Sequence, residues 1–148
     1  MKWYAAHLIM YFKRRQGPQK RFLVWENIVL IRANSSDDAF DKAEQRGREE
    51  EAIDDETLTV GGHPSRMVFA GIRKLTACVD PETRPADGTE VTYNELMVKS
   101  EGIIKKLVAG KAAPVEILEP FPHEEDPARR APAEHTALPA NGRRKRVV

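Results

Sequence analysis

Two stretches near the N-terminus are apolar on both of the faces that an extended chain presents. Residues 2–14 and 21–32 are rich in aromatic and β-branched residues, which favour strands. Gly17-Pro18 lies between them and marks a loop. Two strands joined by a short loop predict an antiparallel hairpin. Because neither strand has a clean polar face, we expect both faces of the hairpin to be partly covered.

A polar start signal and a stripe of small residues predict a helix after this hairpin. Ser35 and Ser36 have hydroxyl groups that can accept hydrogen bonds from free backbone amides at a helix start. The acidic residues after them are favourable at the positive end of a helix dipole. Ala39, Ala43 and Gly47 then recur at helical spacing, and the helix frays at about residue 51. Because this stripe is narrow and its side chains are small, we expect the helix to pack against a flat surface such as a sheet.

The rest of the chain alternates between turns and shorter elements. Residues 57–60 predict a short strand, residues 61–64 a turn, and residues 66–79 a long strand in which Gly71 marks a bulge or a close approach of the helix. Residues 94–99 fit a strand and a helix equally. We expect a strand over 89–97 and a helix over 100–109, which Gly110 would end.

These elements predict an α+β fold, a small antiparallel sheet of four to five strands with helices packed on one face. We expect residues 1–113 to form a single domain. Residues 114–148 form a tail that contains prolines and arginines, mostly disordered beyond Pro122, because too little apolar surface remains there to offset the entropy of ordering.

Composition changes this picture mainly through charge. The 148 residues carry a net charge of +1, but residues 1–34 carry +6 and residues 35–58 carry −7. Cys78 is the one cysteine, so no disulfide forms within the chain and a cytoplasmic location is the simplest expectation. No run is long enough to span a membrane. Residues 3–12 lack a cleavage site after them, which favours a strand over a signal peptide.

Several short stretches, taken in order, resemble the bacterial domain-of-unknown-function family 4288 over roughly residues 3–98. They are Trp3 to Ala6, Trp25 to Ala33, Ser35 to Ala43, Phe69 to Ile72 with Leu75, and Asp87 to Val91 with Tyr93. The resemblance implies a compact α+β fold in a bacterial cytosol and supplies no catalytic residues. The tail departs from the family's short form.

The residues that carry chemistry form no recognisable catalytic or metal-binding motif. The four histidines lack the spacing of metal ligands, Cys78 has no base near it in sequence, and no phosphate-binding loop is present. We therefore expect no enzyme, no metal and no cofactor. Glu26 and Glu90 lie in or beside apolar strands, where a pair of carboxylates with His7 would offer acid–base chemistry. The alternative is a salt bridge from Glu26 or Glu90 to Arg32, Arg66 or Arg73.

Two charged surfaces favour binding over catalysis. The acidic helix predicts a docking surface for a protein partner, which suits an accessory, regulatory or immunity-type protein. Its residues are Asp37, Asp38, Asp41, Glu44 and Glu49. The alternative is a nucleic-acid-binding protein that uses a basic hairpin tip and the aromatic residues of the sheet. The tip residues are Lys13, Arg14, Arg15, Lys20 and Arg21. The apolar strand faces also admit a homodimer, and no membrane partner is expected.

Overall fold

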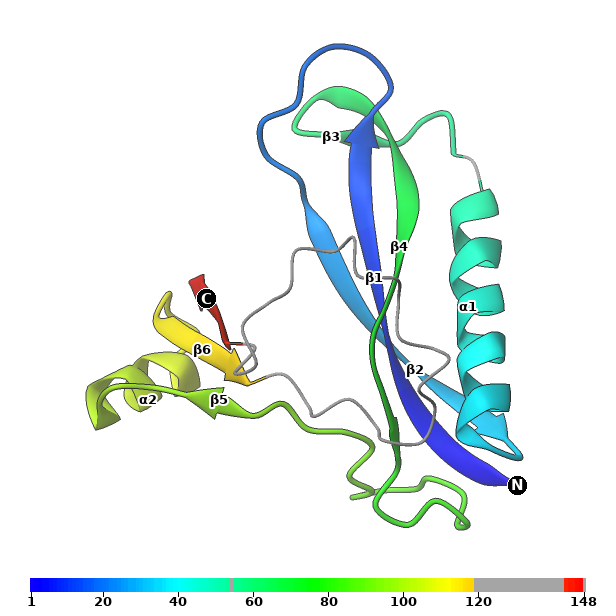
Figure 1. Cartoon of the computed structure of the whole chain (residues 1–148). Coiled ribbons are helices and arrows are strands. Elements are labelled where there is room, and N and C mark those ends of the chain that lie inside the picture. Colours follow the sequence, from blue (N-terminus) through cyan, green and yellow to red (C-terminus); the bar gives the residue numbers. More distant parts are fainter. Residues whose placement is uncertain (54, 119–142, 148) are drawn as a thin grey trace. The chain divides into compact units, whose positions relative to one another are not determined.

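A computed structural model describes residues 1–53, 55–118 and 143–147. They form two compact units, residues 1–92 and 93–148, which are described separately (Figure 1). The first unit contains β1 (Lys2–Arg14), β2 (Val24–Ala33), α1 (Ser36–Ala52), β3 (Thr59–Val60) and β4 (His63–Ala77). The second contains β5 (Leu96–Met97), α2 (Glu101–Val108), β6 (Pro114–Leu118) and β7 (Arg143–Val147). The fold is α+β, as predicted.

The first unit is an antiparallel sheet in the order β2-β1-β4-β3, with β1 between its two long neighbours (Figure 1). β1 and β2 pair in one unbroken register, from Lys2 opposite Ala33 to Tyr11 opposite Val24. The register of β1 with β4 shifts twice, so that Ala70 and Arg73 have no partner on β1. Gly71 lies between these two extra residues with a φ of 142°, a value that L side chains rarely adopt. The bulge expected there is confirmed.

One face of this sheet forms the core with α1. Ala6, Leu8 and Met10 of β1 are fully buried with Ala43 of α1, and hydrophobic residues of β2 and β4 pack around them. The buried residues of α1 are the three small ones that the sequence singled out, Ala39, Ala43 and Gly47. Ser35 caps the helix, since its hydroxyl accepts from the amide of Asp38 at 3.1 Å. Small side chains let the helix backbone lie close to the sheet.

β2 begins three residues later than predicted, because the side chain of Gln19 forms hydrogen bonds with backbone groups in the segment before it. Gln19 donates to the carbonyls of Phe12 and Arg21 and accepts from the amide of Arg14. These bonds hold residues 15–23 as a loop rather than a continued ladder. β4, by contrast, begins three residues early, because Pro64 and His63 pair with β3.

The second unit contains a three-stranded antiparallel sheet in the order β5-β6-β7. The predicted helix over 100–109 is confirmed as α2, whose cap is Ser100. The strand expected over 89–97 is wrong in extent, since only Leu96–Met97 pairs, with β6. β6 and β7 lie within the predicted tail. The disorder expected beyond Pro122 is contradicted at β7, and residues 119–142 and 148 fall outside the described residues. No helix in the described ranges is long and apolar enough to cross a membrane.

Candidate functional site

A network of polar side chains crosses the far face, which we define as the side of the four-stranded sheet turned away from α1. His7 on β1 alternates with Ala6 and Leu8, which face α1, so His7 points to the far face. Glu26 comes from β2 and Arg73 from β4, while Thr92 follows β4 in an extended segment that belongs to no strand. Three strands and one connecting segment therefore supply the network.

Short hydrogen bonds join these four side chains in a chain. Nδ1 of His7 lies 2.8 Å from Oε1 of Glu26, and Nε of Arg73 donates to the same oxygen at 2.7 Å. Nε2 of His7 lies 2.9 Å from the hydroxyl of Thr92. Because an ionised carboxylate only accepts, Nδ1 carries the proton, and a neutral ring accepts the hydroxyl proton of Thr92 at Nε2. The network thus fixes one tautomer of His7.

The electrostatics of the network keep His7 neutral and Glu26 ionised. Burial lowers the pKa of His7 below its ordinary 6.5, and the cations Lys74 and Arg73 lower it further, although Glu26 opposes them. Burial alone would raise the pKa of Glu26, but the hydrogen bonds from Arg73 and His7 and their charges outweigh it, so that pKa lies below 4.5. His7 is fully buried, and the Lys74 opposite it is 9% exposed.

Hydroxyl, imidazole and carboxylate follow one another here in the order used by acyl-transfer enzymes. A base in such a triad must take up a proton, and its carboxylate must stabilise the resulting imidazolium. Here Arg73 already neutralises Glu26, and the lowered pKa of His7 makes proton uptake unfavourable. Among the described residues every buried side-chain nitrogen and oxygen has a hydrogen-bond partner. The arrangement therefore suits a structural tie that fixes strand register.

The salt bridge that the sequence offered as the alternative for Glu26 is formed, while its pairing with Glu90 stays a prediction. Glu26 binds His7 and Arg73, which is the salt-bridge alternative, and no interaction joins it to Glu90 within the described residues. Sequence reasoning missed Thr92 and Lys74. In the ranges that the structure covers, no three His, Cys, Asp or Glu residues are grouped as metal ligands. Cys78 is buried, and burial raises the pKa of its thiol.

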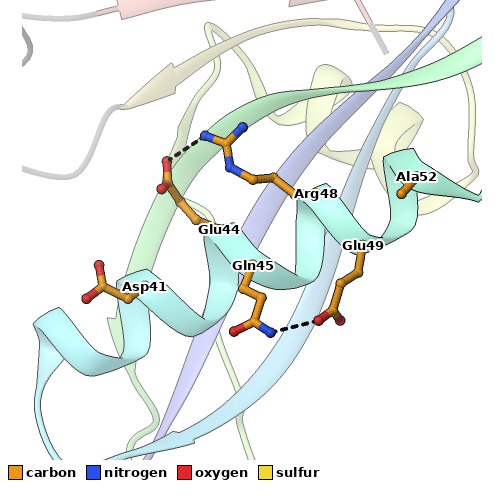
Figure 2. Close-up of a pocket in the computed structure, with 6 residues that line it drawn as sticks. All are labelled: Asp41, Glu44, Gln45, Arg48, Glu49 and Ala52. Carbon is orange, nitrogen blue, oxygen red and sulfur yellow. Dashed lines mark hydrogen bonds and ion pairs between the residues drawn. The ribbon is translucent and has the colours of Figure 1, made fainter.

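Several acidic side chains on the outer face of α1 are bonded to neighbours on the same helix. Asp41, Glu44 and Glu49 line an open hollow of about 520 Å³ together with other residues of the same helix, Gln45, Arg48 and Ala52 (Figure 2). Figure 2 shows the ion pair of Arg48 with Glu44 and the hydrogen bond of Gln45 with Glu49. The first joins its atoms at 3.9 Å, and in the second Gln45 donates to Glu49 at 2.8 Å. Asp38 lies outside the hollow, where it binds Lys42 and the Asn34 amide. Asp37 lies on the first turn of α1.

The basic residues of the hairpin lie at the end of β1 and in the loop that follows. Lys13, Arg15, Lys20 and Arg21 are exposed, and Arg14 donates to the carbonyl of Pro18. Two aromatic rings near them are half exposed, Phe22 against Tyr11 and Trp25 against Phe12. Tyr4 and Phe12, which were also expected to offer stacking faces, are buried, and nucleic-acid binding at this end of the sheet stays a prediction.

One exposed surface of the first unit is apolar and belongs to β2. Val24, Ile28 and Leu30 alternate along the strand, and their exposed fractions are 45%, 46% and 40%. Val29 and Ile31 pack towards α1, so these three side chains lie on the far face. We call them the β2 strip. The sequence indicated it only through the apolar character of both faces of residues 21–32.

Comparison with known proteins identifies the first unit. No curated protein and no solved structure matches the chain. A family model described as Domain of unknown function (DUF4288) matches residues 3–93. This range covers more than half of the chain, almost all of the first unit, and every residue of the His7 network. The resemblance inferred from the short stretches is confirmed, and the chain belongs to the DUF4288 family.

Proposed function

We propose that this protein is a non-enzymatic protein-binding module of the bacterial cytosol, of accessory, regulatory or immunity type. The β2 strip carries the proposal. Exposed apolar side chains gathered on one face are characteristic of binding surfaces. The strip also lies on an outer strand of the sheet, where an extended segment of a partner can add main-chain hydrogen bonds to side-chain contacts.

The outer face of α1 supports a secondary role in recognition. Seven acids and three bases give residues 36–52 a net charge of −4. A basic partner would be attracted to this face, and such attraction acts mainly on association rate and selectivity. Pairs such as Glu44 with Arg48 are included in this net charge, and four acids remain in excess of the bases. The acidic residues therefore steer a partner in this proposal, and the β2 strip holds it.

A matched pair of substitutions tests the proposed surface. Ile28→Lys places a charge in the β2 strip, and Ile104→Lys places one on α2 at a side chain with almost the same exposure, 48% against 46%. A photo-reactive residue at position 24 is used to capture contacts in the native host. We expect captured protein with the parent chain and with Ile104→Lys, and its loss with Ile28→Lys. Equal capture by both variants contradicts the proposal.

A second candidate is binding of single-stranded nucleic acid at the basic hairpin end. It is favoured by the half-exposed rings of Phe22 and Trp25, which could stack on bases and which follow Lys20 and Arg21 closely in sequence. Fluorescence anisotropy with single-stranded DNA and RNA at low salt is the test. Binding that weakens steeply with salt and with Lys20→Glu/Arg21→Glu supports this function. The absence of any signal at low salt removes it.

A further inference from the structure

β2 and β4, the two strands that flank β1, differ in how their outer edges are protected against pairing with a further strand. Natural sheets blunt exposed edges with bulges, lysines or prolines. β4 has both register shifts, together with Pro64 and Lys74. β2 has none of these devices: its ten residues include no proline, glycine or lysine, and its register is unbroken. Within the described part of the chain, no strand pairs with the outer edge of β2.

The hydrogen-bonding groups at that outer edge can be assigned from the register. The amide of Phe12 donates to the carbonyl of Leu23 at 3.0 Å, so residues 12 and 23 form a hydrogen-bonded pair. Such pairs alternate along an antiparallel ladder. Odd-numbered residues of β2 therefore bond to β1, and the even-numbered ones direct their amides and carbonyls outward. In agreement, the carbonyl of Arg32 accepts from Nζ of Lys42 on α1.

Four of the five even-numbered residues of β2 are complementary to themselves. In order they are Val24, Glu26, Ile28, Leu30 and Arg32. A two-fold axis perpendicular to the sheet at Val29 would place Ile28 opposite Leu30 of a second copy, and Glu26 opposite Arg32 of that copy. Directly opposite residues share a face in antiparallel pairing, so apolar residues would meet apolar ones and opposite charges would meet on the far face.

We propose that β2 pairs antiparallel with β2 of a second copy about this axis, joining the two sheets into one. This inference rests on the proposed function, because it names the partner that the β2 strip receives. Pairing buries Ile28 and Leu30, which are 46% and 40% exposed in the single chain. The carbonyl of Arg32 has two lone pairs, so it can keep Lys42 and still accept from the amide of Glu26 in the second copy.

The first test is the mass of the full chain by sedimentation equilibrium at about 100 µM, a concentration that detects micromolar dimers. We expect twice the 16.7 kDa chain mass for the parent and for Ile104→Lys, and the single-chain mass for Ile28→Lys. Circular dichroism checks that Ile28→Lys still folds. A monomeric parent, or a dimer that Ile28→Lys leaves intact, overturns the inference.

The second test probes the register itself in a Cys78→Ala background. Val29→Cys faces its own copy across the axis in a pair without hydrogen bonds, where Cα atoms lie about 4.5 Å apart and a disulfide can form. Ile31→Cys is the control, because it lies opposite Asn27 and about 13 Å along the strand from its own copy. Mild oxidation is expected to cross-link only Val29→Cys. Equal cross-linking of both overturns the proposed register.

These outcomes separate the inference from the proposed function. A monomeric parent that still captures a partner, with capture lost in Ile28→Lys, overturns self-pairing and leaves the protein-binding function standing. Dimers cross-linked through Val29→Cys, with other proteins captured equally by Ile28→Lys, uphold self-pairing and contradict the β2 strip as the site for a different protein.

Discussion

The His7 network makes the folded chain sensitive to acid. Because burial lowers the pKa of His7 below 6.5, the unfolded chain protonates this histidine first as the pH falls, and stability declines from about pH 7 downward. Glu26 adds to the decline only below 4.5, since its lowered pKa keeps the folded carboxylate ionised there. For one proton the loss is at most about 1.4 kcal/mol per pH unit.

Urea unfolding at about pH 7 and about pH 5 measures this loss, within the window in which His7 acts before Glu26. We expect the parent to lose stability between these two pH values, and His7→Gln to lose much less while being less stable throughout. His63→Gln is the control, because His63 is exposed at the start of β4, and it should behave as the parent does. If His7→Gln lost as much stability between these two pH values as the parent does, the role assigned to His7 would be contradicted.

The sequence predicted individual members of this network but not the network. Glu26 and His7 stood out as polar residues in apolar strands, and Arg73 was one of three possible partners for a carboxylate. The register of β4 on β1 decides among the three, and it shifts at two extra residues that no periodicity shows. Thr92 was placed in a strand that does not form. Its contact with His7 joins residues 85 positions apart, beyond the reach of local patterns.

At the scale of elements, strong local sequence signals predicted the helices and strands correctly, and weak signals did not. The long strands, α1 and α2 follow from β-branched runs, caps and small-residue spacing. The strand expected over 89–97 failed because alternation there has no neighbouring strand to pair with except at Leu96–Met97. β6 was missed because Pro114 and the prolines after it resemble a linker, although Pro at the first position of a strand is tolerated.

The close contact between α1 and β4 can be tested at one glycine. A Cβ on Gly47 would overlap the ring of Phe69, whereas a Cβ on Gly102 of α2 would meet only the Ser100 hydroxyl, at 3.6 Å. Alanine favours a helix over glycine by about 1 kcal/mol. We expect Gly47→Ala to destabilise the first unit by roughly 1–3 kcal/mol despite this gain. Gly102→Ala should be neutral or stabilising.

Chemical denaturation followed by tryptophan fluorescence measures the first of these effects, because both tryptophans, Trp3 and Trp25, lie in the first unit. Circular dichroism follows Gly102→Ala in the second. If Gly47→Ala proved as stable as the parent, α1 would have to lie farther from Phe69 than the structure places it.

At the scale of the whole molecule, a charge count along the sequence does not show which charged side chains are engaged by neighbours. Residues 35–58 carry −7, yet four carboxylates of α1 are engaged by a neighbour four residues away on the same helix. The +6 of residues 1–34 includes Arg32, whose guanidinium lies 5.9 Å from the Trp3 ring centre. What distinguishes the surface is the β2 strip, which charge counting does not detect.

Self-pairing through β2 has a consequence for the stability of the whole chain. If unfolding requires dissociation, mass action raises the unfolding midpoint with protein concentration, since the dimer stabilises the folded chain by about 2.7 kcal/mol when the concentration exceeds the dissociation constant 100-fold. We expect thermal midpoints of the parent and of Ile104→Lys to rise between low and high micromolar concentration. Ile28→Lys should melt at one temperature throughout. A parent midpoint independent of concentration would show that the folded chain stands alone, with the β2 strip left for another protein.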